Sequence, residues 1–571
     1  MWEKEKNRDD IFRVWDTKAL QGVHEDPCRR ALFTPKKVLW TAGEVINSEV
    51  LLEQRELQIS LGAHEPCVMK SRKGKMASIL LDYGQEIHGG IKLLVWNSNV
   101  LQGAKVRIRF GESAAEAMAE LGGEKNATND HARRDLRMEV GMMSMNPVGE
   151  TGFRFVRIDL EETQGEIWLK SVPAVFVYKD VEYKGSFLSS DPLLNRIWDV
   201  GAYTVHLNMQ EYIWDGIKRD RLVWVGDMHP ETTTIQAVFG EDDAVERSLD
   251  FIREETPLPG WMNGMASYTM WYVIIVYDWY FHTGKKAFLE KQREYLEGAA
   301  DQLSEYIDEE GKDTVKEGRF LDWPSEGKGA VVDAGVQAIH AWAAASLQKI
   351  FQVLGDENRA ERCRADLKRL RACKMDYQDS KQAAALLVIN GMEDPGEVNE
   401  RLLKKGGAQG MSAFMGYYIL TARAMAGDYQ GCLDCIRDYW GGMLSLGATT
   451  FWEDFDVRWL ENAARIDELP AEGKIDVHGT YGAYCYSGYR HSLCHGWASG
   501  VTPWLSENVL GIQVLEAGCR KVKVDPHLGD LEWAKGAYPT PYGLIRVSHR
   551  KREDGSIDTQ IQAPEEIEVV K

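Results

Sequence analysis

The stretch that decides the fold is Ser189-Ser190-Asp191-Pro192-Leu193-Leu194-Asn195-Arg196-Ile197-Trp198-Asp199-Val200-Gly201-Ala202-Tyr203. Its apolar residues, continued at Leu207, recur at helical spacing and so share one face of a helix. Ser and Asp before such a run are typical N-cap residues, because their side-chain oxygens accept bonds from free backbone N–H groups. We therefore predict that a helical domain begins here.

The residues before this point have the period of β-strands. In Gly152–Leu160 and Lys105–Phe110 the side chains nearly alternate between apolar and polar, as in strands with one buried face. Gly, Asn and Asp turns separate such runs. This pattern predicts a β-sandwich over 36–185, preceded by an N-terminal extension over 1–35.

Helical periodicity continues after Leu207, and several of the helical runs close at a glycine such as Gly284, Gly355 or Gly427. The predicted helices lie near Thr269–His282, Lys286–Ile307, Ala334–Leu354, Lys381–Ile389 and Met411–Ala426. We assign 186–508 to this helical domain. Short strands and an Asp554-Gly555 turn follow, which predict a C-terminal β domain over 509–571.

Bulk properties exclude several classes of protein. A formal charge of −20 argues against nucleic acid and anionic membranes as partners, because phosphate binding needs clustered Lys and Arg. There is no apolar run long enough to span a bilayer. The charged start lacks a secretory signal pattern, and the nine cysteines are scattered, so we expect a cytoplasmic protein. Cys432 and Cys435 fit one face of a helix, and no metal-ligand cluster is apparent, so no cofactor is expected.

Two acidic loops are the candidate chemical site. Residues 214–227 set Asp215, Asp220 and Asp227 among basic residues and tryptophans, and 447–456 place Glu453 beside Trp452. Cleavage of a glycosidic bond needs one carboxylic acid to protonate the departing oxygen and one carboxylate to activate water or attack carbon. A solvated loop with internal ion pairs explains the first stretch equally well from spacing alone.

A family resemblance separates these readings. Asp215, Arg219, Arg221, Leu222, Trp224, Gly226 and Asp227 match the signature loop of the bacterial α-L-rhamnosidases, glycoside hydrolase family 78. Gly447-Ala448-Thr449-Thr450-Phe451-Trp452-Glu453 and Ser492-Leu493-Cys494-His495-Gly496-Trp497 resemble two later motifs of the family, in the family's order. Gly529–Gly536 and Pro539–Gly543 resemble its C-terminal β domain.

The resemblance implies an (α/α)6 barrel as catalytic domain, with β-sandwich domains before and after it, and hydrolysis with inversion. It makes Glu453 the general base and Asp220 the general acid, at a position where the family normally has Glu. Glu231 and Glu326 are the reserve acids. The substrate-binding residues that it implies are Asp215, Arg219, Trp224, Asp227, Asp322, Trp323, Trp452 and His495.

The expected partner is a small carbohydrate with a terminal α-L-rhamnosyl or related deoxy-sugar group. The shortened acid and the replacement of the family's Cys-Pro by Gly216-Ile217 leave two alternatives open. One is a related barrel glycosidase for a different or acidic sugar. The other is a catalytically impaired sugar-binding homologue. A homodimer is compatible with the sequence, which carries no direct signal of oligomeric state.

Overall fold

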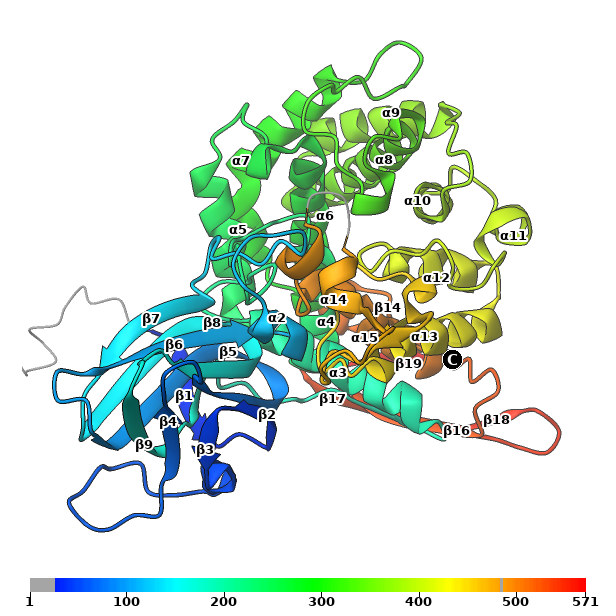
Figure 1. The fold of residues 1–571 in the computed structure, drawn as a ribbon. Helices are drawn as coiled ribbons and strands as arrows, with labels where there is room; N and C mark the ends of the chain where they lie inside the picture. The colour runs from blue at the N-terminus through cyan, green and yellow to red at the C-terminus, as the bar shows by residue number, and fades with distance from the viewer. Residues whose placement is uncertain (1–25, 483–485) are drawn as a thin grey trace, which may run out of the picture.

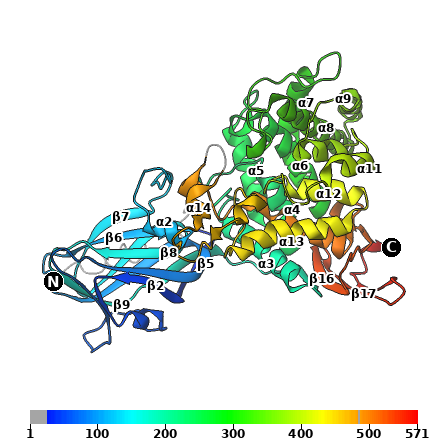
Figure 2. The ribbon, with the colours of Figure 1, turned by 45° about the vertical axis from the view of Figure 1, so that its right-hand side comes forward.

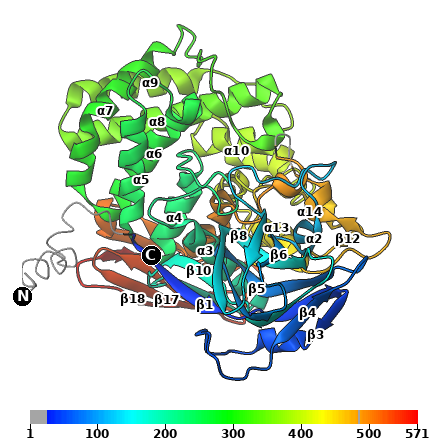
Figure 3. The same cartoon turned by 60° about the vertical axis from the view of Figure 1, so that its left-hand side comes forward.

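The computed structural model describes residues 26–482 and 486–571 (Figure 1). An N-terminal β domain lies on one side of a helical domain, as Figure 2 shows from a second direction. The strands of a C-terminal β domain lie at the base of the helices (Figure 3). Among the described residues, none of the helices combines the length and the apolar character needed to cross a bilayer.

The N-terminal domain is a β-sandwich of antiparallel strands. In chain order these are β1 (Cys28–Phe33), β2 (Lys37–Ala42), β3 (Glu44–Ile46), β4 (Cys67–Ser71), β5 (Ala77–Ser98), β6 (Ala104–Gly111), β7 (Asp135–Val140), β8 (Ser144–Leu160), β9 (Gly165–Ser171) and β10 (Ala174–Lys179). The main order is β3-β4-β9-β5-β8-β6-β7, and β5 also pairs with β2 and β10. Because the long β5 is bulged and pairs with four strands, it joins both layers around one apolar core.

The predicted strands 105–110 and 152–160 are confirmed as parts of β6 and β8. Strand β1 lies within the range that the sequence assigned to an extension, and it pairs with β10 along its whole length. Residues 1–25 of that range lie outside the described residues. A short helix, α2 (Ala114–Met118), follows β6 and faces the helical domain, where it contacts α14 (Val477–Thr480).

The helical domain begins where the change of period predicted it. Helix α3 (Pro192–Asn208) starts with Pro192, and the Asp191 side chain accepts a hydrogen bond from the backbone N–H of Leu193. The other main helices are α4 (Met228–Val238), α5 (Asp243–Glu255), α6 (Ala266–Thr283), α7 (Lys286–Glu305), α8 (Gly329–Leu354), α9 (Glu357–Ala372), α10 (Lys381–Ile389), α12 (Gly416–Met425), α13 (Tyr429–Ser445) and α15 (Val501–Trp504).

The helices form an inner and an outer layer. Helices α4 and α6 are buried on nearly every side, which is expected of helices enclosed by others. By contrast, α5 and α9 bury one stripe and expose charged residues on the opposite face. Gly284 and Gly355 end α6 and α8 in the left-handed conformation, as their positions in the sequence indicated.

The C-terminal domain consists of two small sheets. One contains β11 (Ser186–Ser189), β16 (Trp533–Thr540), β17 (Gly543–Lys551) and β18 (Ile557–Gln562), and the other contains β14 (Ile512–Val514), β15 (Lys521–Val524) and β19 (Glu568–Val570). The predicted turn at Asp554-Gly555 is confirmed between β17 and β18. Strand β11 directly precedes α3, so its pairing with β16 ties the first helix of the barrel to this domain.

Candidate active site

A narrow cavity of about 70 Å³ opens at the end of the barrel where α4 and α6 begin. Seven residues proposed from the sequence line it together: Asp215, Asp220, Trp224, Asp227, Trp323, Glu453 and His495. Five further residues complete the lining: Met265, Tyr268, Phe320, Tyr486 and Trp497. The acidic loops that lie far apart in the chain thus meet at one pocket.

The first acidic loop is closed on itself by Asp215. Asp220 and Arg221 both have positive φ, 55° and 54°, so the chain reverses between Arg219 and Leu222. The Leu222 N–H then donates to Asp215 Oδ1 at 3.0 Å, and the Asp215 N–H donates to the Leu222 carbonyl at 3.2 Å. This reversal places Asp220 at the pocket while its neighbour Arg219 stays buried beside it.

Arg219 connects the two acidic loops. Its Nη1 lies 3.1 Å from Asp220 Oδ1, and its Nη2 donates to Glu453 Oε2 at 2.9 Å. Its Nε donates to the Arg490 carbonyl at 2.6 Å, and the guanidinium lies 3.6 Å from the centre of the Tyr486 ring. A planar fork with several donors suits this task, because it fixes two carboxylates relative to each other.

Three further hydrogen bonds hold Glu453, two with Ser492 and one with Trp497. The backbone N–H of Ser492 donates to Glu453 Oε2 at 3.0 Å, and the Glu453 N–H donates to the Ser492 carbonyl at 3.0 Å. The indole N–H of Trp497 donates to the Glu453 carbonyl at 2.9 Å. The Glu453 carboxylate, 2% exposed, therefore enters the pocket in a fixed orientation.

Burial shifts the pKa values of three further pocket residues, Asp215, Asp227 and His495. Burial, followed by the charge of Asp227, raises the pKa of Asp215 well above its usual range. Burial also raises the pKa of Asp227 to about 8, although the Tyr268 hydroxyl donates to it at 2.7 Å. Burial lowers the pKa of His495, 3.8 Å from Asp227, to about 3. These shifts favour the uncharged form of all three groups, which suits the binding of neutral hydroxyl groups.

His131 contacts a pocket residue, although the sequence gave no reason to choose it. It lies on the loop between α2 and β7 of the N-terminal domain, and its Nδ1 contacts Asp220 Oδ1. Its Nε2 lies 3.3 Å from Asp130, and its side chain is 41% exposed, against 5% for Asp220. No motif connects residues 89 positions apart in the chain, so only the folded structure reveals this pair.

Several candidates from the sequence do not line the pocket. Asp322 is buried behind Trp323, where it accepts bonds from Ser412 Oγ at 2.7 Å and the Ser325 N–H at 3.1 Å. Trp452 is 1% exposed and packs against Phe455 in the barrel core. Of the reserve acids, Glu231 is fully buried on α4 and Glu326 is exposed.

The N-terminal domain supports the first acidic loop and the segment that carries His495 through one buried carboxyl group. Glu112 pairs with the Lys218 ammonium at 2.9 Å and accepts from the Leu493 N–H at 2.7 Å. Glu112, Glu116 and His478 are close enough together to ligate a metal ion. However, Lys218 also lies 3.6 Å from Glu116, so its ammonium already supplies the positive charge in this cluster.

Comparisons with known proteins agree with this geometry. Residues 182–383 match the model of the bacterial alpha-L-rhamnosidase 6-hairpin glycosidase domain, and residues 511–570 match that of the bacterial alpha-L-rhamnosidase C-terminal domain. A curated alpha-L-rhamnosidase of Alteromonas sp. (strain LOR) is 25% identical over 85% of this chain, which spans 55% of that relative's length.

Two solved structures have the same fold. A GH78 family rhamnosidase of Bacillus sp. GL1 is 23% identical with a TM-score of 0.74, over 91% of this chain and 55% of that one. A rhamnosidase from Klebsiella oxytoca with rhamnose bound is 19% identical with a TM-score of 0.64, over 84% of this chain and 95% of that one. Two segments of the chain thus match the 6-hairpin glycosidase and C-terminal domains of bacterial α-L-rhamnosidases, and the overall fold is that of solved rhamnosidases.

Proposed function

We propose that the chain hydrolyses terminal α-L-rhamnosyl linkages, or those of a closely related deoxy-sugar, with inversion at the anomeric carbon. The observation that carries this proposal is the Arg219 guanidinium, which contacts Asp220 and Glu453 on two separate loops at one aromatic pocket. The named relatives are α-L-rhamnosidases, and the Klebsiella oxytoca structure is described with rhamnose bound. Because the chain spans about half the length of its curated relative, the activity is a proposal.

In the proposed reaction Glu453 is the general base. It removes a proton from a water molecule as the oxygen attacks the anomeric carbon, and Asp220 protonates the departing glycosidic oxygen on the other side. An inverting pair needs its carboxyl groups roughly 6.5–9.5 Å apart to admit this water. Arg219 contacts the two carboxyl groups through different nitrogens, Nη1 for Asp220 and Nη2 for Glu453.

His131 supplies the proton that Asp220 loses in each turnover. Asp220 is nearly buried, whereas the imidazole that contacts it is partly exposed and reaches solvent. A side chain in this position transfers protons between bulk water and an enclosed acid. Asp130, next to the other ring nitrogen, keeps the imidazole oriented.

The remaining lining recognises the sugar. Protonated Asp215 and Asp227 donate to ring hydroxyls, and the neutral His495 imidazole bonds a third polar group. Trp224, Trp323 and Phe320 provide apolar walls, which suit a sugar that carries a methyl group in place of a hydroxymethyl group.

The test is hydrolysis of a panel of aryl glycosides, with the anomer of the released sugar followed by NMR. We expect preferential release of L-rhamnose, first as the anomer opposite to that of the substrate. Release with retained configuration would remove Glu453 as a base, and release of a different sugar would replace the substrate assignment. A preference for an acidic sugar would contradict the lining, because four carboxyl groups face the pocket.

The contacts of Asp220 favour one second candidate, a homologue that binds sugar without cleaving it. Arg219 and His131 both engage Asp220 Oδ1, so the carboxyl group could serve only as an anchor. Such a protein would bind L-rhamnose and hydrolyse no member of the panel.

Cellular location and assembly are proposals of the same kind. Every cysteine among the described residues is a free thiol, which supports a reducing compartment such as the cytoplasm. Cell fractionation tests the location, and light scattering tests the predicted homodimer.

A further inference from the structure

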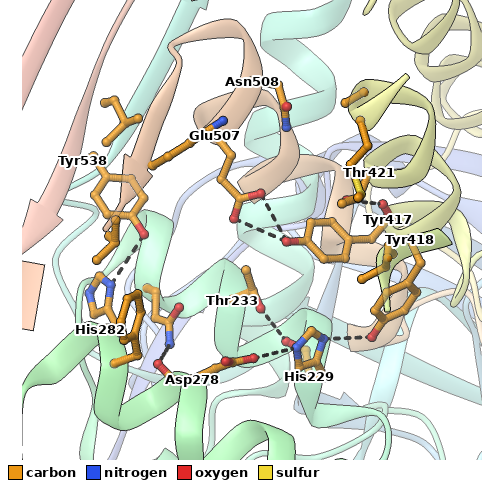
Figure 4. Close-up of a pocket in the computed structure, with 18 of the residues that line it drawn as sticks. His229, Thr233, Asp278, His282, Tyr417, Tyr418, Thr421, Glu507, Asn508 and Tyr538 are labelled. Carbon is orange, nitrogen blue, oxygen red and sulfur yellow. Dashed lines mark hydrogen bonds and ion pairs between the residues drawn. The ribbon is translucent and has the colours of Figure 1, made fainter. Parts of the chain in front are cut away.

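A second and larger cavity, of about 440 Å³, lies at the other end of the inner helices. Helices α4 and α6 begin near the catalytic pocket, at Asp227 and Tyr268, and their later residues Gln236 and His282 line this cavity. Gln513 and Tyr538 of the C-terminal domain border it, and Figure 4 shows Tyr538 beside His282. Its volume falls within the range of about 300–1,000 Å³ that is typical of small-molecule sites.

The lining combines aromatic faces with linked polar groups. Tyr417 donates through its hydroxyl to Glu507, with distances of 3.1 and 3.4 Å to the two carboxyl oxygens (Figure 4). His229 bonds the Tyr418 hydroxyl at 2.8 Å and lies 3.1 Å from Asp278, and Trp342 packs edge-on against its ring. Aromatic rings beside fixed carboxyl, hydroxyl and amide groups suit a ligand with an apolar ring face and several hydroxyls.

The charges of the lining exclude other ligand classes. None of the described residues that line this cavity is a lysine or arginine, so a phosphate or carboxylate group would find no cationic partner. A cationic amine would need an available carboxylate. Asp278 Oδ2 already bonds His229, which leaves Oδ1 for a hydroxyl group, and burial raises the pKa of Glu507 to about 8, which favours its uncharged form. An uncharged polyhydroxylated ligand fits best.

We propose that this cavity is a second, non-catalytic saccharide site, which binds a monosaccharide or the end of a short oligosaccharide. The sugar ring packs against Trp342 and Tyr417, and its hydroxyl groups bond Glu507 and Asp278. The site goes beyond the proposed hydrolysis, because the catalytic pair Asp220 and Glu453 lies in the other pocket.

The test is saturation-transfer NMR and calorimetric titration of the full chain with L-rhamnose, L-fucose, D-glucose and D-galactose, at millimolar concentration. Asp227→Ala removes a binding group of the catalytic pocket, and Ala424→Phe fills the second cavity, with Ala424→Ser as the matched control that leaves it open. We expect the Asp227→Ala protein to keep one sugar site, and the protein with both Asp227→Ala and Ala424→Phe to bind none.

A second variant guards against a failure of Ala424→Phe to fold. Glu507→Leu keeps the side-chain volume but removes the polar group, and should weaken binding at this site at least about tenfold, as expected for loss of one strong hydrogen bond. The proposal is overturned if Asp227→Ala abolishes all sugar binding, or if both cavity variants bind as the wild type does. It is also overturned if putrescine, added as a cationic amine, displaces the sugars from this cavity. Hydrolysis of aryl rhamnosides by Ala424→Phe reports separately on the proposed function.

Discussion

Replacement of Arg219 by lysine tests how the two carboxylates are positioned. The guanidinium makes three polar contacts, one each with Asp220, Glu453 and the Arg490 carbonyl, and a lysine ammonium at the end of a flexible chain can keep only one carboxylate in place. A hydrogen bond to a charged group contributes about 1.5–3 kcal/mol. If the transition state requires both carboxylates, loss of one contact lowers kcat/KM roughly 10- to 150-fold, because about 1.4 kcal/mol corresponds to tenfold.

The assay is hydrolysis of an aryl α-L-rhamnoside by Arg219→Lys, with the melting temperature measured on the same sample. Arg247→Lys is the matched control, because Arg247 pairs with Asp243 on the surface of α5 and does not line the pocket. We expect the control to retain wild-type kcat/KM. A fully active Arg219→Lys protein with an unchanged melting temperature would refute the positioning role of the guanidinium.

Four further substitutions test the proposed roles of single residues. Glu453→Gln should lower kcat by about 10²- to 10⁴-fold whatever the leaving group. Asp220→Asn should lose most activity on substrates with poor leaving groups and retain it on dinitrophenyl rhamnoside. Equal losses on both kinds of substrate would exclude this division of roles. His131 has a φ of 62°, which glycine adopts readily, so His131→Gly should fold. This variant should reduce kcat at least about tenfold, and added imidazole should restore part of the lost activity. No response to imidazole would leave His131 a structural role only. Asp227 keeps a proton that the unfolded chain, with an aspartate pKa of about 3.9, releases, so the free energy of unfolding falls as pH rises from about 4 to about 8. Asp227→Asn lacks this loss, so its melting temperature should drop less than that of the wild type between about pH 5 and about pH 8; parallel curves would contradict the raised pKa.

The sequence predicted the helical domain well where apolar spacing was regular. The expected helix Lys381–Ile389 has the same bounds in the structure. The expected helix Thr269–His282 is slightly longer in the structure, where it spans Ala266–Thr283. The expected helix Met411–Ala426 begins later, at Gly416, because residues 411–412 are irregular and residues 413–415 form a turn before the helix. Periodicity reports which residues are buried, but it does not show where backbone hydrogen bonding starts.

The motifs of the candidate site could be predicted from the sequence, but the pocket residues outside those motifs could not. The acidic loops carry a recognisable pattern, and the structure brings Asp220, Glu453 and His495 to one pocket. Tyr268 lies in the first turn of a thoroughly buried helix, where an aromatic residue reads as ordinary core packing. Conversely, Trp452 belongs to a motif but packs in the core, because an indole serves a sugar and a protein interior equally well.

The contacts of Glu112 with Lys218 and Leu493 have a practical consequence for engineering. A barrel expressed without its β domain would lose Glu112 and Glu116, the two carboxyl groups beside the Lys218 ammonium, and with them the counter-charge of this loop. Heat inactivation of the complete chain should accordingly coincide with melting of the sandwich, even though the sandwich contains neither of the proposed catalytic carboxyl groups. Any transplant of these loops into another scaffold must therefore bring a counter-charge with them.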